Sequence, residues 1–457
     1  MAKSINIYKS ISDYNDGYDE RKNISLSLII DDEEDEIVDS HVKTGFVTFT
    51  AEEAGSTIGL YKLSTYQLLE YTTDQVVNPS EMCYPVWKKM DVNTIITLAN
   101  AGDEVYIRGL LSGDNSLSDY TQFKMTGKIA ASGNCNVIWN YNNLNAPLRQ
   151  YCGYSMFQGC TSLTTSPELP ATILAGNCYN SMFLNCTSLT TTPELPATTL
   201  ADGCYDSMFL NCTSLTTSPE LPATTLANYC YYYMFYGCTS LTTTPELPAT
   251  KLANDCYDSM FKGCTSLTKA PELPATTLAY GCYQSMFYGC KSLTTAPELP
   301  ATTLASWCYR EMFSGCTSLT TAPELPATTL AYGCYRFMFN GCTSLTTAPE
   351  LPATTLAKVC YGSMFNGCTN LTTAPELPAT TLTYYCYYYM FYGCSKLNYI
   401  KCLATDISES NCTYNWVDGV SPTGTFVKVQ DTSWSTGYNG IPYDWTVIEE
   451  DIEVVEE

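Results

Sequence analysis

The sequence predicts a repeat solenoid of short strands and short helices, preceded by an all-β, sandwich-like domain. Three observations lead to this fold class. A phrase with two cysteines recurs at a fixed step of 26 residues over more than half of the chain. In each copy, a segment with helix-like spacing of apolar residues alternates with a Thr- and Pro-rich segment. Ahead of the copies lie short, alternating, β-rich segments separated by turn residues.

These patterns divide the 457 residues into four segments. They are an acidic N-terminal segment (1–41), a β-sandwich-like domain (42–134), a solenoid of ten repeats with an N-terminal cap (135–401), and a C-terminal cap with an acidic tail (402–457).

The first segment, 1–41, contains the charge run Asp31–Glu36, which is typical of solvated, mobile chain. We expect this segment to act as an anchor, for instance to other virion proteins. Its start lacks a basic region followed by an apolar core, so no secretory signal is predicted. No stretch is apolar for long enough to insert into a membrane. We therefore expect the protein on a virion surface or, if a signal has been removed, in an extracellular location at a cell surface.

The second segment has short runs of alternating apolar and polar residues, rich in β-branched and aromatic types, which predict a small β-sandwich. The expected strands are Phe46–Ala51, Thr57–Leu63, Leu68–Thr73, Thr94–Leu98, Glu104–Gly109 and Phe123–Ile129.

The repeats begin at a cysteine, which we number position 0, and a second cysteine follows at position +8. The first cysteines are Cys152, Cys178, Cys204, Cys230, Cys256, Cys282, Cys308, Cys334, Cys360 and Cys386. Apolar residues at helical offsets predict a short helix over Cys178–Leu184, ended by Asn185 or, in most copies, Gly, because both tolerate the left-handed conformation. From Leu189, the Thr-rich stretch interrupted by Pro193 and Pro196 predicts a brief strand that pairs with stacked neighbours.

A single repeat cannot fold alone. Fixing its residues costs roughly 1–2 kcal/mol each, whereas its buried side chains return only about 10–15 kcal/mol in total. Stacking must supply the difference, so both ends need caps. Val137–Trp139, Leu144 and Leu148 fit a degenerate first turn.

At the other end, Cys412 begins a decayed eleventh copy. Trp416, Val417 and Gly419 take the places of its Met, Phe and Gly. Strands closing the core are predicted at Thr423–Lys428 and Trp445–Ile448.

The repeat resembles the BspA-type leucine-rich repeats of bacterial surface proteins, in which an aromatic residue and Gly/Asn-Cys precede Ser-Leu-Thr. The first copy supplies Phe157, Gly159, Cys160 and Ser162–Thr164. The resemblance covers roughly residues 135–425. It implies a leucine-rich-repeat-like solenoid with strands on one face and helices on the other, and a role in adhesion. The Pro-Glu-Leu-Pro tetrapeptide departs from the family pattern and stiffens the strand side.

The 24 cysteines lack the paired spacing of zinc sites. Cys178 and Cys186 would lie ~12 Å apart on a helix, too far for a disulfide. We interpret the cysteines as two stacked columns of buried thiols, with disulfides between repeats as the alternative. No metal site and no cofactor is predicted.

Enzyme activity is not expected, because the recurring thiols lack a neighbouring base and no catalytic constellation can be assembled. The net charge of −24 argues against nucleic acid as a partner. A column of glutamates recurs once per repeat, about 5 Å apart if the strands stack. We expect them to be exposed and solvated, with cation bridging as the alternative. They are Glu168, Glu194, Glu220, Glu246, Glu272, Glu298, Glu324, Glu350 and Glu376.

Variation between the copies gathers just before position 0 and at positions +2, +3 and +6, which would point outward from the predicted helix. Drift at unconstrained surface positions explains such variation, but Tyr is common there, and exposed Tyr beside Arg suits recognition. The candidate binding residues are Tyr232, Tyr233, Tyr236, Tyr280, Trp307, Arg310, Arg336, Tyr388, Tyr389 and Tyr392.

Three functions fit these observations. The first is a phage virion fibre or decoration protein that binds a glycan or protein on a bacterial or host surface. The second is a bacterial cell-surface adhesin, and the third is a structural spacer without a ligand. Assembly into a homo-oligomer is compatible with each of them.

Overall fold

The structure is a computed structural model that describes residues 45–74 and 85–451. These residues belong to one unit, His41–Glu457. The anchor expected at residues 1–41 lies outside the described residues.

Residues 45–132, joined by a short strand at 163–165, form two sheets. Most of their strands, such as Val47–Ala51, alternate between buried and more exposed side chains. One sheet has the order β4-β3-β6-β1-β8-β9 and the other the order β5-β2-β7. The strands are β1 (Val47–Ala51), β2 (Ser56–Lys62), β3 (Gln67–Thr72), β4 (Lys88–Lys89), β5 (Ile95–Leu98), β6 (Glu104–Leu111), β7 (Gln122–Thr126), β8 (Ile129–Ser132) and β9 (Leu163–Thr165). The rings of Phe49 in β1 and Phe123 in β7 lie 5.6 Å apart, so apolar side chains join the two sheets.

Each strand predicted for this region overlaps one of β1, β2, β3, β5, β6 and β7. The last strand of the region, β8, pairs in parallel with β9, which belongs to the first repeat. The Phe123 ring stacks on Phe157 of that repeat at 5.3 Å. The region is therefore continuous with the repeats in backbone pairing and in packing, and its independence as a domain ending at residue 134 stays a prediction.

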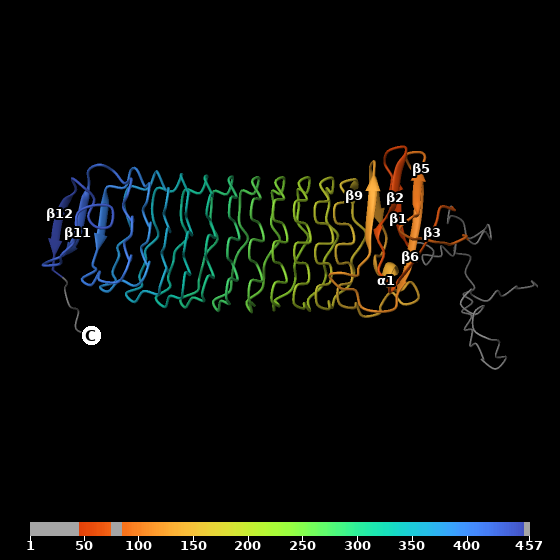
Figure 1. Ribbon diagram of the computed structural model, residues 1–457, viewed down its shortest axis with the longest axis horizontal. Helices are drawn as coiled ribbons and strands as arrows, with labels where there is room; N and C mark the ends of the chain where they lie inside the picture. Colours follow the sequence, from red (N-terminus) through yellow and green to blue (C-terminus); the bar gives the residue numbers. More distant parts are fainter. Residues whose placement is uncertain (1–44, 75–84, 452–457) are drawn as a thin grey trace, which may run out of the picture. The chain divides into compact units, whose positions relative to one another are not determined.

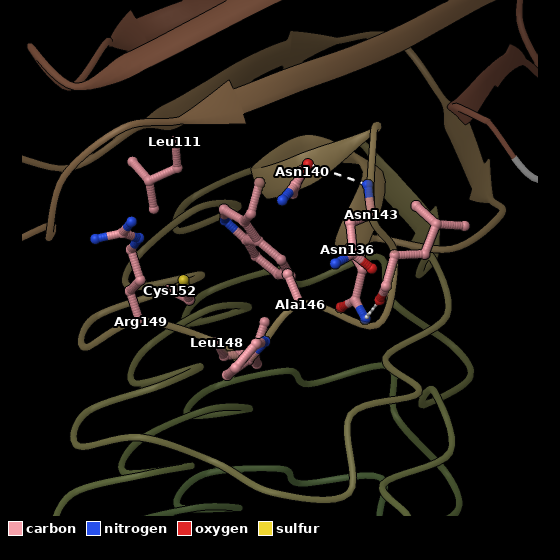
Figure 2. Close-up of a pocket in the computed structure, with 11 residues that line it drawn as sticks. Leu111, Asn136, Asn140, Asn143, Ala146, Leu148, Arg149 and Cys152 are labelled. Atoms are coloured by element: carbon pink, nitrogen blue, oxygen red, sulfur yellow. Dashed lines mark hydrogen bonds between the residues drawn. The ribbon is translucent and has the colours of Figure 1, made fainter. Parts of the chain in front are cut away.

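The start of the repeats is covered by α1 (Asn136–Asn140), which buries Val137, Ile138 and Trp139. The Trp139 ring lies 5.9 Å from the ring of Tyr179 in the second repeat. A loop over residues 143–149 follows, and a cavity of about 350 Å³ lies between it and α1 (Figure 2). The sequence identified the apolar residues of this turn but not the cavity.

The repeats stack through backbone hydrogen bonds from each copy to the next, and Figure 1 shows them as successive coils that follow β9. The N–H groups at positions +3, +5 and +7 donate to carbonyls of the following copy. In the repeat that begins at Cys256 these bonds are Ser259 to Gln284 (2.8 Å), Phe261 to Met286 (3.0 Å) and Gly263 to Tyr288 (2.7 Å). Every second N–H thus joins two copies, as in a parallel sheet.

The prediction of short helices in the repeats is wrong. Within residues 45–74 and 85–451, α1 is the only α-helix. The N–H groups at +4, +6 and +8 bond three residues back, as from Met260 to Tyr257 (3.2 Å), so the segment is a series of tight turns. Positive φ recurs every four residues, at −1, +3 and +7, for example 52° at Asp255, 55° at Ser259 and 76° at Gly263.

The left-handed conformation at +7 was expected from Gly or Asn, and it is confirmed. At −1 and +3 the left-handed residues include Tyr, Trp, Glu and Ser, whose identity gives no such signal. An ordinary L-residue loses roughly 1–2 kcal/mol in this conformation. Because the turns aim alternate N–H groups at the neighbouring copy, the hydrogen bonds of the stack offset this loss.

The predicted Thr-rich strands are mostly reduced to single parallel bridges between neighbours, such as Thr295 with Thr321 and Thr321 with Thr347. Only β9 at one end of the stack and β10 (Tyr399–Cys402) at the other reach strand length. The prolines on either side of each Glu-Leu explain this, since proline has no N–H to donate.

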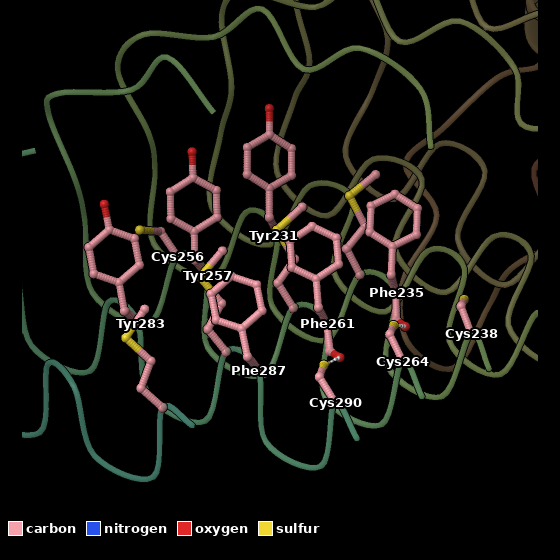
Figure 3. Close-up of a cluster of buried hydrophobic side chains, with 14 of the residues drawn as sticks. Tyr231, Phe235, Cys238, Cys256, Tyr257, Phe261, Cys264, Tyr283, Phe287 and Cys290 are labelled. Carbon is pink, nitrogen blue, oxygen red and sulfur yellow. Dashed lines mark hydrogen bonds between the residues drawn. The ribbon is translucent and has the colours of Figure 1, made fainter. Parts of the chain in front are cut away.

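Identical side chains form columns in the interior of the repeats (Figure 3). The Phe rings at +5 stack with centroids 5.5–5.8 Å apart. The Tyr rings at +1 stack at 5.7–6.1 Å. The Tyr column was not predicted as core, yet its members from Tyr179 to Tyr387 are at most 1% exposed.

The predicted columns of buried thiols are confirmed, since every cysteine in the described part of the chain is buried and free. The thiol at +8 also has a bonding role. From Cys186 to Cys394 it donates to the Phe carbonyl of the preceding copy, with sulfur-to-oxygen distances of 3.0–3.1 Å. That carbonyl also accepts the N–H of the +8 cysteine in its own copy, so the thiol adds a second bond between neighbours.

The far end is closed by β10, β11 (Thr425–Val429) and β12 (Thr446–Glu450), which pair in parallel. Both strands predicted there are present. Trp416 occupies the Met position, fully buried, and its ring stacks on Tyr387 at 6.0 Å. Its indole N–H donates to the carbonyl of Gly440 at 2.9 Å. The decayed eleventh copy therefore continues the core and covers it with a larger aromatic side chain.

Candidate binding face

We define the turn face as the surface made by positions −2, −1, +2, +3 and +6 of the repeats. All ten predicted binding residues lie on it, and each is half-buried or exposed. The tight turns, rather than a helix, place them there. The structure brings nine of the ten into three aromatic groups.

The Tyr232 group consists of Tyr229, Tyr232, Tyr233 and Tyr236. Tyr232 meets Tyr233 with ring centroids 4.1 Å apart, and Tyr233 meets Tyr236 at 5.5 Å, both edge to face. Tyr229 contacts Tyr232 at 5.8 Å and is 46% exposed. The ammonium of Lys262 lies 6.0 Å from the Tyr236 ring. Each ring is therefore fixed by its neighbours while part of the group faces solvent.

The Trp307 group combines aromatic rings with two guanidinium groups. Trp307 meets Tyr332 edge to face at 4.9 Å. The guanidinium carbons of Arg310 and Arg336 lie 4.9 and 6.0 Å from the Trp307 ring. A Cβ at Gly333 would come within 2.6 Å of this ring, so the glycine leaves room for the indole.

The two arginines of this group are differently held. Arg310 forms an ion pair with Glu311 at 2.9 Å, while its buried Nε donates to no described side chain or backbone group. Arg336 lies 4.8 Å from the Phe337 ring. Burial, reinforced by the nearby Arg310, lowers the pKa of Arg336 from its usual value. Both guanidinium groups are thus partly desolvated and lie against rings, which strengthens their attraction to a bound acceptor.

The Tyr388 group is the largest. Its neighbouring rings have centroids between 4.2 and 5.7 Å apart. Its members are Tyr384, Tyr385, Tyr388, Tyr389, Tyr392 and Tyr414. Asn415 donates to the Tyr389 hydroxyl at 3.1 Å. The tenth predicted residue, Tyr280, is 49% exposed and makes no ring contact with the aromatic side chains that the structure describes.

The sequence profile of the BspA type Leucine rich repeat region matches the chain in six copies. The matches cover residues 140–268, 204–320 and 308–416, together more than half of the chain. The chain belongs to this family. No curated protein matches it significantly. BspA-type proteins are often associated with cell surfaces and adhesion. No helix in the described part of the chain is both long and apolar enough to cross a membrane.

In this BspA-type chain, sequence reasoning missed several members of the three groups. Tyr229, Tyr332, Tyr384 and Tyr385 stand one or two residues before position 0, and Tyr414 stands at +2 of the capping copy. A signal for these residues was present in the sequence. Aromatic residues occur at −2 and −1 in the copies that carry the predicted residues, or in the copies next to them.

A buried and a half-buried carboxyl group flank the Tyr232 group on the +2 column. Asp258, 4% exposed, accepts hydrogen bonds from the Ser259 hydroxyl at 2.7 Å and from the Gln284 amide at 2.9 Å. Burial raises the pKa of Asp258 to about 7. Burial likewise raises the pKa of Asp206, on the other side, to about 6. The face beside these tyrosines therefore changes charge near neutral pH.

The opposite side of the repeats carries the glutamate column, and all nine of its members are exposed, as expected. At its end, Glu376 pairs with Lys401 at 3.4 Å. Across residues 45–74 and 85–451, three or more His, Cys, Asp or Glu side chains do not converge in a geometry that could hold a metal ion. Cation bridging by the glutamates stays untested.

Proposed function

We propose that this BspA-type protein is a non-enzymatic recognition protein, displayed on a phage virion as a fibre or decoration protein, that binds a cell-surface glycan or protein through its turn face. The observation that carries the proposal is the gathering of part-exposed aromatic rings into three groups on one face. The opposite face repeats Thr and Glu almost without change, which suits uniform solvation rather than discrimination.

The packing of the rings favours binding. Edge-to-face contacts hold each tyrosine against its neighbours, so little side-chain freedom remains to be lost when a ligand binds. Tyrosine and tryptophan also offer large contact areas with a polar tip, and adjacent Arg and Lys supply donors. A rigid scaffold with a variable aromatic surface is the arrangement expected of a recognition module.

The thiols give no support to a catalytic role. Burial raises the pKa of Cys238 and Cys316 to about 12, so their nucleophilic thiolate forms are scarce at neutral pH. Their regular use in bonds between copies accounts for them structurally.

The test compares two sets of substitutions in the full chain. Changing Tyr232, Tyr233, Tyr388 and Tyr389 together to Ala should weaken attachment to host cells or to arrayed glycans at least about tenfold, as expected when interface aromatic residues are truncated. The matched control changes the exposed Glu246, Glu272 and Glu298 to Gln and should leave attachment within about twofold. The reverse result would place the functional face on the glutamate side. The genes adjacent to this one, for capsid and tail proteins or for an outer-membrane operon, test the virion assignment.

A further inference from the structure

The three aromatic groups are evenly spaced along the stack. The first +2 residues of the three groups are Tyr232, Arg310 and Tyr388, and each interval between them is three repeats of 26 residues. The second and third groups also contain the +2 residue of the following copy, Arg336 and Tyr414. The buried tyrosines beside them stack at 5.7–6.1 Å per repeat, so successive groups lie about 17–18 Å apart.

The copies between the groups have a different surface. In the interval before Trp307, position +2 holds Asp258 and Gln284, with Tyr280 and Tyr288 as single exposed rings. In the interval before Tyr388, Val359, Gly362 and Ser363 occupy −1, +2 and +3. Glycine and serine leave nothing to stack on. The turn face therefore alternates aromatic groups with surfaces of lower contact area.

We propose that the ligand of the turn face is a linear, neutral polysaccharide whose repeating unit matches this spacing, so that one polymer chain contacts the Tyr232, Trp307 and Tyr388 groups together. This inference rests on the proposed function and names its substrate class. A polymer repeats its chemistry at fixed intervals, as the three groups do, whereas the surface of a globular partner offers no such period.

The chemistry of the groups supports a neutral sugar polymer. Part-exposed ring faces, such as those of Tyr332 and Tyr384, accept the C–H faces of sugars, while phenol and guanidinium groups bond to hydroxyls. The net charge of −24 repels polyanions, and Glu311 offsets the charge of Arg310.

Contact with all three groups by one polymer chain raises the overall affinity through effective concentration. Once one group holds the polymer, the others meet it at high local concentration, and avidity exceeds single-site affinity by roughly 10²–10⁴ if the spacing allows simultaneous contact. Avidity is lost when the geometry forbids it. The spacing of the groups is therefore the property to test.

Two variants, each lacking one repeat, distinguish an effect of the spacing between the groups from an effect on the stability of the fold. Removing residues 343–368 keeps the register and every group residue but reduces the second interval from three repeats to two. Removing residues 187–212 shortens the stack by the same length and leaves both intervals between the three groups intact. Among the aromatic rings of the turn face, it changes only the distance from the Tyr232 group to Tyr151 and Tyr154 of the first copy, whose rings lie 5.7 Å apart. Both variants retain the two caps, so comparable thermal midpoints are expected and are measured first.

Binding is then measured to immobilised dextran, mannan, galactomannan and mixed-linkage β-glucan, and to soluble fragments of each that are too short to join two groups. For the polymer that the intact chain binds, the 343–368 deletion should weaken binding at least about tenfold, while the 187–212 deletion should stay within about twofold of the intact chain. Affinity for the short fragments should be the same in all three proteins.

Each other outcome contradicts a distinct claim. Equal polymer binding by the two deletions overturns the spacing proposal and leaves the proposed function standing. Binding of the intact chain to host cells but to no polymer, with loss after protease treatment of the cells, overturns the polysaccharide and indicates a protein ligand. Absence of binding to both cells and polymers overturns the proposed function itself.

Discussion

The interior of the repeats and their turn face are built from the same short segment, but they follow opposite rules. Positions 0, +1, +4, +5 and +8 repeat almost without change and stack as columns of Cys, Tyr, Met, Phe and Cys. Positions −2, −1, +2, +3 and +6, interleaved with them, change from copy to copy. The tight turns, with left-handed residues every fourth position, send alternate groups of side chains inward and outward. The stack therefore tolerates surface change, because the turn positions contribute mainly backbone groups to the bonds between copies, while the core side chains lie at other positions.

The largest expected effect is on stability, from breaking the interior. Phe261 is fully buried between Phe235 and Phe287 at 5.6 and 5.8 Å. Phe261→Ala leaves a cavity in the middle of the column and should lower the free energy of unfolding by about 3–5 kcal/mol, measured by urea denaturation. The matched change on the turn face, Tyr280→Ala, should stay within about 0.5 kcal/mol. Similar losses for both would contradict the division into core and face.

The second prediction concerns thiol reactivity. Burial raises the pKa of the Cys238 thiol to about 12, from an ordinary value of 9.0, so its thiolate fraction at pH 8 falls about a thousandfold. Native protein without reductant should react with very few equivalents of a thiol reagent, and unfolded protein with nearly all 24 cysteines. Recovery of well under half of the thiols after unfolding would indicate disulfides between repeats.

A third prediction concerns Asp258, which lies at the boundary between the interior of the repeats and the turn face. Because burial raises its pKa from 3.8 to about 7, the folded protein keeps this proton at pH values where the unfolded chain has lost it. The stability that protonated Asp258 contributes to the folded protein is therefore fully present below about pH 4, and it is lost as the pH rises to about 7. Asp258→Asn should be more stable than the parent at pH 8 by about 1–3 kcal/mol and nearly equal at pH 4.

The control for this change is Asp202→Asn, at an exposed −2 position of the turn face. It should alter stability by less than about 0.5 kcal/mol at either pH. A parent and an Asp258→Asn variant with parallel stability curves between pH 4 and pH 8 would show that Asp258 is not held in its protonated form.

The features of the fold that depend on residue type at a fixed spacing could be predicted from the sequence. The period, the buried thiols, the strands β1, β2, β3, β5, β6 and β7, the two closing strands β11 and β12, and the left-handed residue at +7 followed from identity and position. The strands β4 and β8 were not predicted. The turns were not predicted either, because Ser259 and Glu311 are ordinary residues whose left-handed φ is imposed by hydrogen bonds to the next copy. These hydrogen bonds join residues about 26 positions apart, so no pattern of residue types within a single repeat indicates them. The buried Tyr column was recoverable, since Tyr at +1 is constant from Tyr179 to Tyr387 while its neighbours vary.

The candidate face was predicted in outline for a similar reason. Its residues were found because they vary against a constant background, and variation does not require the correct secondary structure. Their grouping was not predicted, because the helix was expected to begin at position 0, which left −1 outside it. In the structure, rings at −1 meet rings at +2 of the same copy, as Tyr229 does with Tyr232.

The smallest expected effect tests, by its sign, whether position +7 is left-handed. Gly289 stands at +7 with φ of 71°, and a Cβ there would meet no atom within 4 Å, so substitution adds no clash. In an exposed helix, Gly→Ala would raise stability by about 1 kcal/mol. In the left-handed turn it should lower stability by roughly 1–2 kcal/mol. Gly289→Asn should cost less than Gly289→Ala, since Asn185 and Asn211 adopt the same conformation at +7 with φ of 61° and 58°. Urea unfolding of the two variants measures this difference, and a stabilising Gly289→Ala would contradict the left-handed conformation at +7.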